Sequence, residues 1–302
     1  MIPCIDLAKL STGDPDSIKA MRVAAMETGF ATVVNTALTP DRVARVIEVY
    51  RAFFKLPDAV KQPVDMASTG SNRGWGASGA EQVDPTANPD YKQVFDSGVI
   101  LPAGDPLLEN PFYAANRWPA QPEGFEAEIS AYFHQACAVG LDVLRGVAVA
   151  LDAPRDSFDA GFKVPMALLR GNYYPSRPAT AGAKDFGIAP HTDYGCLTLL
   201  ATDGAPGLEV RQRGGGWLPV SAQPGTFVIN FGEMMETWTD GAVLATPHRV
   251  VGGHAERISV PLFFNPGHET NIAPAGSGKV IPAGEHLSRR YNETYVHLQK
   301  RA

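Results

Sequence analysis

The segment Ala189-Pro-His-Thr-Asp-Tyr-Gly195 decides the fold assignment, because it places an imidazole and a carboxylate two residues apart, at His191 and Asp193. The apolar run Cys196-Leu-Thr-Leu-Leu200 follows at once. If this region is a β-strand, side chains i and i+2 point to the same face, so both groups can bind one metal ion from one side. A third ligand must come from another segment. The best candidate is His248, which lies between a turn and a second strand-like run.

Two histidines and one carboxylate on one face of a metal ion, with the opposite face open, are typical of non-haem Fe(II) oxygenases. Each residue also has a structural interpretation. His191 can be a solvated turn residue, Asp193 a turn carboxylate and His248 a core histidine. The strand-like flanks, which make the three side chains converge, favour the metal site. Zinc uses the same ligands and binds more tightly than iron, so the ligand set alone leaves the metal open.

Arg257-Ile-Ser259 repeats the i, i+2 spacing on a late strand-like segment. A guanidinium offers a planar fork that matches a carboxylate, and a neighbouring hydroxyl adds one more hydrogen bond. The alternative is a structural ion pair at the end of a strand. Next to a metal site, an inward-facing arginine predicts an anion, which a dicarboxylate co-substrate would supply.

The order of elements predicts helices in the first half and a double-sheet jelly-roll core in the second, a mainly β fold with flanking helices. Helices are predicted from Ser17 to Thr28, from Thr39 to Pro57 and from Glu123 to Leu151. The predicted strands are Ile2 to Leu7, Phe30 to Val34, Met166 to Tyr174, Leu197 to Thr202, Leu208 to Arg211, Thr226 to Phe231, His248 to Val251 and Arg257 to Asn265. Residues 66–122 look irregular and are expected to form a pocket wall or a surface loop.

One oxygenase domain is expected over residues 1–302, because a β-rich enzyme of this length can be a single domain. It divides into a helix-rich N-terminal region with pocket-wall loops (1–165), the jelly-roll core (166–266) and a C-terminal tail (267–302). A last helix is expected from His286 to Lys300.

Composition excludes several classes of partner. The net charge is −6, and Lys and Arg form no dense cluster, so we expect neither nucleic acid nor a membrane surface as a partner. Three separated cysteines do not suggest a disulfide framework and suit a reducing cytosol. No signal peptide and no membrane-spanning run are recognisable, so the expected location is cytoplasmic.

The chain resembles the isopenicillin N synthase-like family of 2-oxoglutarate- and Fe(II)-dependent oxygenases. The matching pieces run in the family's order from residue 2 to about residue 266. They are Ile2-Pro-Cys-Ile-Asp-Leu7, Gly29-Phe-Ala-Thr-Val-Val-Asn35, Arg170-Gly-Asn-Tyr-Tyr-Pro175, His191-Thr-Asp193, Gly207-Leu-Glu-Val210, Pro224-Gly-Thr-Phe-Val-Ile-Asn230, Thr246-Pro-His-Arg-Val250 and Arg257-Ile-Ser-Val-Pro-Leu-Phe-Phe-Asn-Pro266.

The resemblance implies a double-stranded β-helix core and a set of site residues. It implies His191, Asp193 and His248 as iron ligands. It also implies a clamp for the distal carboxylate of 2-oxoglutarate, formed by Arg257 and Ser259. Asn172 and Tyr174 match positions that contact this co-substrate in some members. The alternative is that both simply pack and cap near a turn.

The expected activity is that of an Fe(II)- and 2-oxoglutarate-dependent dioxygenase. It would use O2 to hydroxylate, desaturate or cyclise a small-molecule substrate, with release of succinate and CO2. One alternative is an Fe(II) oxidase on the same scaffold that does not use 2-oxoglutarate, since some family members use the Arg-x-Ser motif to hold the substrate. Another alternative is a non-catalytic binding protein that keeps the metal as a structural element.

Overall fold

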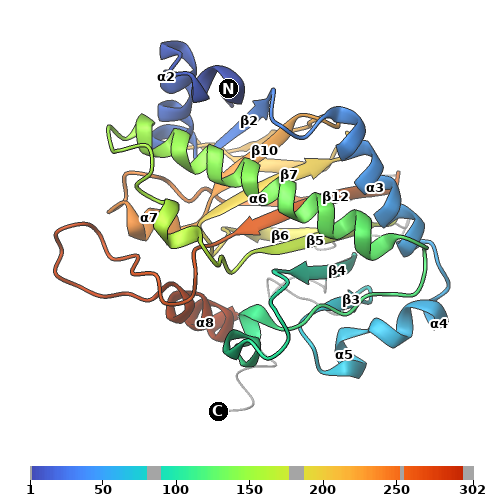
Figure 1. Ribbon diagram of the computed structural model, residues 1–302. Helices are drawn as coiled ribbons and strands as arrows, with labels where there is room; N and C mark the ends of the chain where they lie inside the picture. Colours follow the sequence, from blue (N-terminus) through green and yellow to red (C-terminus); the bar gives the residue numbers. More distant parts are fainter. Residues whose placement is uncertain (1, 80–89, 177–186, 252–254, 295–302) are drawn as a thin grey trace.

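The computed structural model describes residues 2–79, 90–176, 187–251 and 255–294. It contains two β-sheets, and helices cover the larger one (Figure 1). All neighbouring strands run antiparallel except the first pair, β1 and β2. The larger sheet has the order β1 (Cys4–Asp6), β2 (Phe30–Val34), β10 (Phe227–Phe231), β7 (Leu197–Thr202), β12 (Arg257–Phe264), β5 (Leu168–Tyr174), β4 (Gln93–Gly98), β3 (Gly74–Gly76). The smaller sheet has the order β6 (Ile188–His191), β11 (His248–Val250), β8 (Leu208–Arg211), β9 (Trp217–Pro219).

The long helix α6 crosses the outer face of the larger sheet, with α3 and α2 beside it (Figure 1). The α-helices are α1 (Leu7–Ser11), α2 (Pro15–Val23), α3 (Pro40–Phe54), α4 (Asp58–Lys61), α5 (Met66–Thr69), α6 (Phe125–Ala150), α7 (Glu233–Trp238) and α8 (Ala283–Thr294). The shorter helical turns are Ala24–Thr28, Gln62–Val64, Pro106–Glu109, Pro111–Tyr113 and Asp159–Phe162. This arrangement confirms the predicted fold class, mainly β with flanking helices.

Local sequence explains where the covering helices begin and which faces they bury. The Thr39 side chain accepts a hydrogen bond from the Arg42 backbone N–H at 3.3 Å, and Pro40 occupies the first turn of α3, as predicted. In α6 apolar side chains on one face are buried, and Gly140 lets the helix approach closely enough for the Phe264 ring of β12 to lie against it. The helices therefore seal the outer face of the sheet.

The sequence prediction was wrong for part of residues 66–122. This Gly- and Pro-rich region contains β3 and β4, and β4 pairs with β5 over its whole length, from Gln93 opposite Tyr173 to Gly98 opposite Leu168. The pairing is long-range, so no local pattern in β4 predicts it.

The C-terminal helix begins at Ala283, three residues earlier than predicted, and its predicted end lies outside the described residues.

Alternation along β5 and β12 places apolar side chains on the outer face and a mixture of polar and apolar side chains on the inner face. On β12, Ile258, Val260 and Leu262 lie in the hydrophobic core under the helices. The alternate side chains of β5 and β12 face the space between the two sheets. They are Leu168, Arg170, Asn172 and Tyr174 on β5, and Arg257, Ser259, Pro261 and Phe263 on β12. One face of the larger sheet thus packs in the hydrophobic core, and the other lines the space between the two sheets.

Among the helices of the described part of the chain, none is long and apolar enough to cross a membrane.

We predict that Gly171→Ala destabilises the protein. A Cβ atom at Gly171 would lie 2.4 Å from Cδ1 of Tyr50, a fully buried ring, so the α3–β5 contact must open. The expected loss in the free energy of unfolding is about 1–3 kcal/mol. Gly214→Ala is the matched control, because a Cβ atom there meets nothing within 4 Å. Urea denaturation should leave the control within about 0.5 kcal/mol of wild type. Equal stabilities for the two variants would show that the Tyr50 ring does not exclude a side chain at residue 171.

Candidate metal centre and co-substrate cavity

The candidate site lies in a cavity between the two sheets. The larger sheet contributes side chains from β5, β7, β10 and β12, and the smaller sheet contributes side chains from β6, β8 and β11. All seven residues that the sequence singles out line this cavity: Asn172, Tyr174, His191, Asp193, His248, Arg257 and Ser259.

The two histidines face one another across the smaller sheet. His191 ends β6 and is the register partner of His248, the first residue of β11, so the neighbouring strand supplies the second imidazole. The ring centroids lie 4.3 Å apart. His191 Nδ1 lies 2.8 Å from the Ala189 carbonyl oxygen, so this nitrogen donates its proton to the backbone and Nε2 is left as the ligand atom.

Asp193 is not on a strand, and this part of the prediction was wrong. The strand β6 ends at His191, and Asp193 lies in the loop that leads to β7. The N-terminus of α7 holds this loop, because the Glu233 backbone N–H donates to the Asp193 carbonyl oxygen at 2.9 Å. A Cβ atom at Gly232 would lie 2.5 Å from that same oxygen, so only glycine permits the contact. The contacts of this loop with α7 therefore hold Asp193 next to the two histidines.

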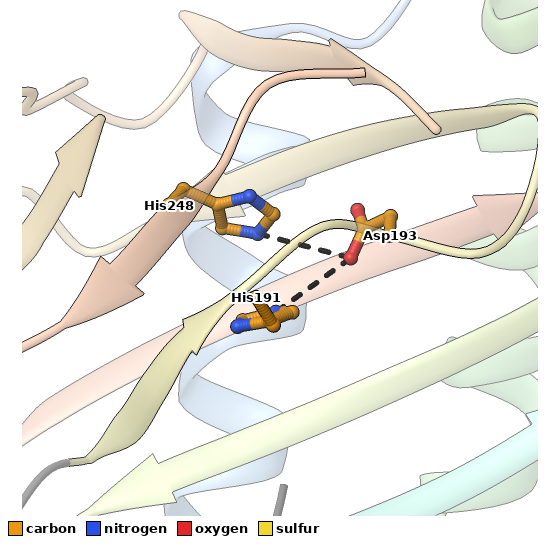
Figure 2. Close-up of side chains that lie close together, drawn as sticks. All are labelled: His191, Asp193 and His248. Carbon is orange, nitrogen blue, oxygen red and sulfur yellow. Dashed lines mark ion pairs between the residues drawn. The ribbon is translucent and has the colours of Figure 1, made fainter. Parts of the chain in front are cut away.

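The three candidate ligands converge on one point (Figure 2). Asp193 Oδ1 lies 3.7 Å from Nε2 of His191 and 3.7 Å from Nε2 of His248. The three ligand atoms lie within 4.8 Å of one another, and within the described ranges no other cluster of three His, Cys, Asp or Glu side chains meets this condition. One ion at their centre can contact all three.

Burial and neighbouring groups together set the protonation states of His191 and Asp193. Burial, and then the charge of the neighbouring His248, lowers the pKa of His191 to about 4. Burial alone would raise the pKa of Asp193. The two imidazoles and hydrogen bonds from Asn230 and Thr198 outweigh it, so this pKa lies below its ordinary value. A neutral imidazole and an ionised carboxylate are the forms that bind a metal.

Arg257 and Ser259 occupy the other end of the cavity. Arg257 pairs with Tyr174 and Ser259 with Asn172 across β12 and β5, so the four side chains share one face. The Arg257 guanidinium lies 5.1 Å from the centroid of the Tyr174 ring. Its Nε and Nη1 atoms are buried and have no hydrogen-bond partner among the described residues, and the same is true of Asn172 Oδ1. A buried cation with free donors fits a bound carboxylate.

The C-terminal helix α8 adds a wall to this cavity. Leu287 lines it, and Arg290 forms a two-point ion pair with Glu233, with Nε 2.6 Å from Oε2 and Nη2 3.0 Å from Oε1. Glu233 also accepts a hydrogen bond from Thr192 Oγ1 at 2.6 Å. The guanidinium lies 4.7 Å from the centroid of the Tyr194 ring. The helix is therefore fastened to the loop that carries Asp193.

Sequence reasoning missed the residues that support Asp193. Asn230 closes the quoted segment Pro224–Asn230, but the segment by itself gives this residue no role. Thr198 looks like an ordinary strand residue, and Glu233 lies in a helix of only six residues. The only sequence signal is a polar residue at an inward position of an otherwise apolar strand. His134 is exposed on α6, away from the three clustered residues, and His254 and His297 lie outside the described residues.

Comparisons with known proteins identify the family. Residues 2–121 match the family described as non-haem dioxygenase in morphine synthesis N-terminal, and residues 165–266 match the 2OG-Fe(II) oxygenase superfamily. The 2-oxoglutarate-dependent dioxygenase ecdK of Aspergillus rugulosus is 30% identical over 89% of this chain and 89% of its own length. The chain belongs to the 2-oxoglutarate- and Fe(II)-dependent oxygenase superfamily. This oxygenase is an enzyme, a dioxygenase that uses Fe(II), 2-oxoglutarate and O2.

Two further relatives resemble the oxygenase over nearly its whole length. Homoarginine-6-hydroxylase 2-ODD-233 of Oryza sativa subsp. japonica is 29% identical over 98% of each chain. The crystal structure of a full-length Neurospora crassa protein in complex with alpha-KG superposes with a TM-score of 0.85, at 28% identity, over 97% of this chain and 96% of that chain. These relatives support the dioxygenase interpretation over the oxidase and binding-protein alternatives.

We predict that Arg290→Met loosens α8. It removes a two-point ion pair whose side chains are 28% and 24% exposed, which costs about 1 kcal/mol after screening by solvent. The backbone amides of α8 should then exchange with solvent about 5-fold faster, measured by hydrogen–deuterium exchange. Arg289→Met, at the exposed neighbouring position, is the control. Equal exchange in the two variants would show that the Arg290–Glu233 ion pair does not hold α8 in place.

Proposed function

We propose that His191, Asp193 and His248 hold the Fe(II) ion of this oxygenase. One observation carries the proposal: the three ligand atoms lie within 4.8 Å of one another, with Asp193 Oδ1 at the same 3.7 Å distance from both imidazole Nε2 atoms. The ligand set alone would also accept zinc, and family membership decides for iron.

We further propose that 2-oxoglutarate binds between the metal centre and Arg257. The guanidinium would take the distal carboxylate with its free donors, and the Ser259 hydroxyl would add a hydrogen bond. The Tyr174 ring lies within cation–π range of the guanidinium, and Asn172 Oδ1 is free to accept a hydrogen bond from a bound ligand or water. These four residues would fix the co-substrate in one orientation.

With 2-oxoglutarate and O2, the bound Fe(II) supplies oxidative decarboxylation to succinate and CO2 together with oxidation of a C–H bond. The chain supplies position and a dry surrounding. Leu168, Phe263 and Leu287 present apolar surface to the cavity, while Thr192 and Tyr194 add polar groups next to Asp193. A small-molecule substrate that is hydroxylated, desaturated or cyclised fits such a cavity. The relatives include a homoarginine hydroxylase and the Neurospora crassa protein solved with alpha-KG and thymine, both concerned with small molecules.

The chain is proposed to work as one oxygenase domain, residues 1–302, in the cytoplasm. The main hydrophobic cluster joins residues from Ile5 to Leu287, which supports one folding unit. Cys4, Cys137 and Cys196 are free thiols, which suits a reducing compartment.

We predict that His191→Ala and Asp193→Ala each reduce succinate formation to background. Each change removes a ligand, and two remaining side chains do not retain the ion. Mass spectrometry of succinate, with 2-oxoglutarate and Fe(II) supplied, measures the effect. His134→Ala, an exposed histidine on α6, controls for loss of an imidazole as such. Wild-type succinate yields in either ligand variant would refute the assignment.

We predict that Arg257→Ala raises the KM for 2-oxoglutarate about 10- to 100-fold, because a charge-assisted hydrogen bond to a carboxylate is lost. The KM of Arg257→Lys should lie between those of the wild type and Arg257→Ala, since lysine keeps the charge but not the planar fork of the guanidinium. Arg211→Ala, an exposed arginine on β8, should leave this KM unchanged. If Arg257→Ala turns over with the wild-type KM, the co-substrate clamp lies elsewhere.

A further inference from the structure

We infer that Thr198 and Asn230 are positioning residues that occupy one oxygen of the Asp193 carboxylate and leave only the other for the metal. The inference rests on the proposed function, in which Asp193 is a ligand. Asn230 Nδ2 donates to Asp193 Oδ2 at 2.7 Å, and Thr198 Oγ1 donates to the same oxygen. Oδ1 is the atom that faces the two imidazoles, as the dashed lines of Figure 2 show.

The two donors come from neighbouring strands in direct register. Thr198 on β7 is the partner of Asn230 on β10, so both side chains project from the same face of the larger sheet into the cavity. The two residues are 5% and 3% exposed, so water competes little for their hydrogen bonds. The rigid sheet therefore holds a hydroxyl and an amide side by side against one carboxylate oxygen.

The main chain and the side chain of Asp193 are held by different elements. The Glu233 N–H at the start of α7 fixes the carbonyl oxygen of Asp193, whereas Thr198 and Asn230 fix the rotation of its carboxylate. Loss of the Thr198 hydroxyl or the Asn230 amide should thus let the carboxylate rotate without moving the loop.

The consequence concerns how many positions on the metal stay open. A carboxylate binds a metal through one oxygen or through both. With hydrogen-bond donors on Oδ2, Asp193 would offer one oxygen to the metal, so the three side chains would supply three ligand atoms and leave the rest of the metal for the co-substrate. A carboxylate that is free to rotate can take a fourth position and compete with 2-oxoglutarate.

The experiment measures metal binding rather than turnover. Thr198→Val removes the hydroxyl with almost no change of shape, and Thr198→Ser restores it. Thr202→Val is the matched control, since this buried hydroxyl on the same strand donates to the Ala222 carbonyl oxygen at 2.6 Å and does not contact Asp193. Co(II) affinity by anaerobic titration calorimetry, and the visible spectrum of the Co(II)-loaded protein, report the strength of binding and the coordination number.

We expect Thr198→Val to weaken Co(II) binding about 10-fold or more and to alter the visible spectrum, as other losses of such supporting contacts do. Thr198→Ser and Thr202→Val should bind as wild type, even where Thr202→Val lowers the unfolding midpoint. Asn230→Ala removes the second donor from the other strand and tests the same inference if Thr198→Val does not fold.

Unchanged or tighter Co(II) binding with a wild-type spectrum in Thr198→Val and Asn230→Ala would overturn the inference. Asp193→Ala separates this failure from a failure of the proposed function. If Asp193→Ala binds Co(II) as wild type does, the ligand assignment itself is wrong. If Asp193→Ala loses the metal while the other two variants keep it, the assignment stands and only the positioning role fails.

Discussion

The alternation of side chains along β5 and β12 is the constraint on which the rest of the structure depends. Every second residue of these strands faces the cavity, so the residues between them must be buried by something on the other face. Helices α3 and α6 provide that cover, and Gly171 is small because the Tyr50 ring lies directly above it. A slip of one residue would turn Ile258 into the cavity and the Arg257 charge into an apolar core. The apolar packing on the outer face thus fixes the register of the polar residues inside.

Ion pairs outside the cavity add a second restraint on the same strand. The Asp203 carboxylate accepts a hydrogen bond from the Ile258 backbone N–H at 2.8 Å and pairs with Arg51 of α3 at 3.0 Å. Arg51 also pairs with Glu256 at 2.7 Å. These contacts bracket Arg257 on both sides along the chain. A charged side chain with free donors can stay buried there because its backbone is fastened to a helix and cannot swing the guanidinium out to water.

The sequence predicts the parts of this structure whose signals are local. The Thr39-Pro40 start of α3 and the i, i+2 spacing of Arg257 and Ser259 depend on the dihedrals and periodicity of one segment, and both appear as predicted. Asp193 does not follow the strand rule, because its position is set by an amide of α7, some forty residues away in the chain. Strand β4 was missed for a similar reason, since it exists through its pairing with β5. Long-range contacts of this kind leave no periodic trace in the segment they organise.

The loop that carries Asp193 also links the candidate metal centre to the apolar wall that Leu287 of α8 adds to the cavity. Thr192 donates to Glu233, Glu233 pairs with Arg290, and the helix that carries Arg290 also places Leu287 against the cavity. A displacement of α8 would therefore move the apolar wall formed by Leu287 and would also disturb the Thr192–Glu233 hydrogen bond next to Asp193. Thr198 and Asn230 of the larger sheet hold the Asp193 carboxylate directly, so its side chain has contacts that do not pass through α8. The candidate metal ligands therefore have supports on the larger sheet, whereas the apolar wall depends on the position of α8.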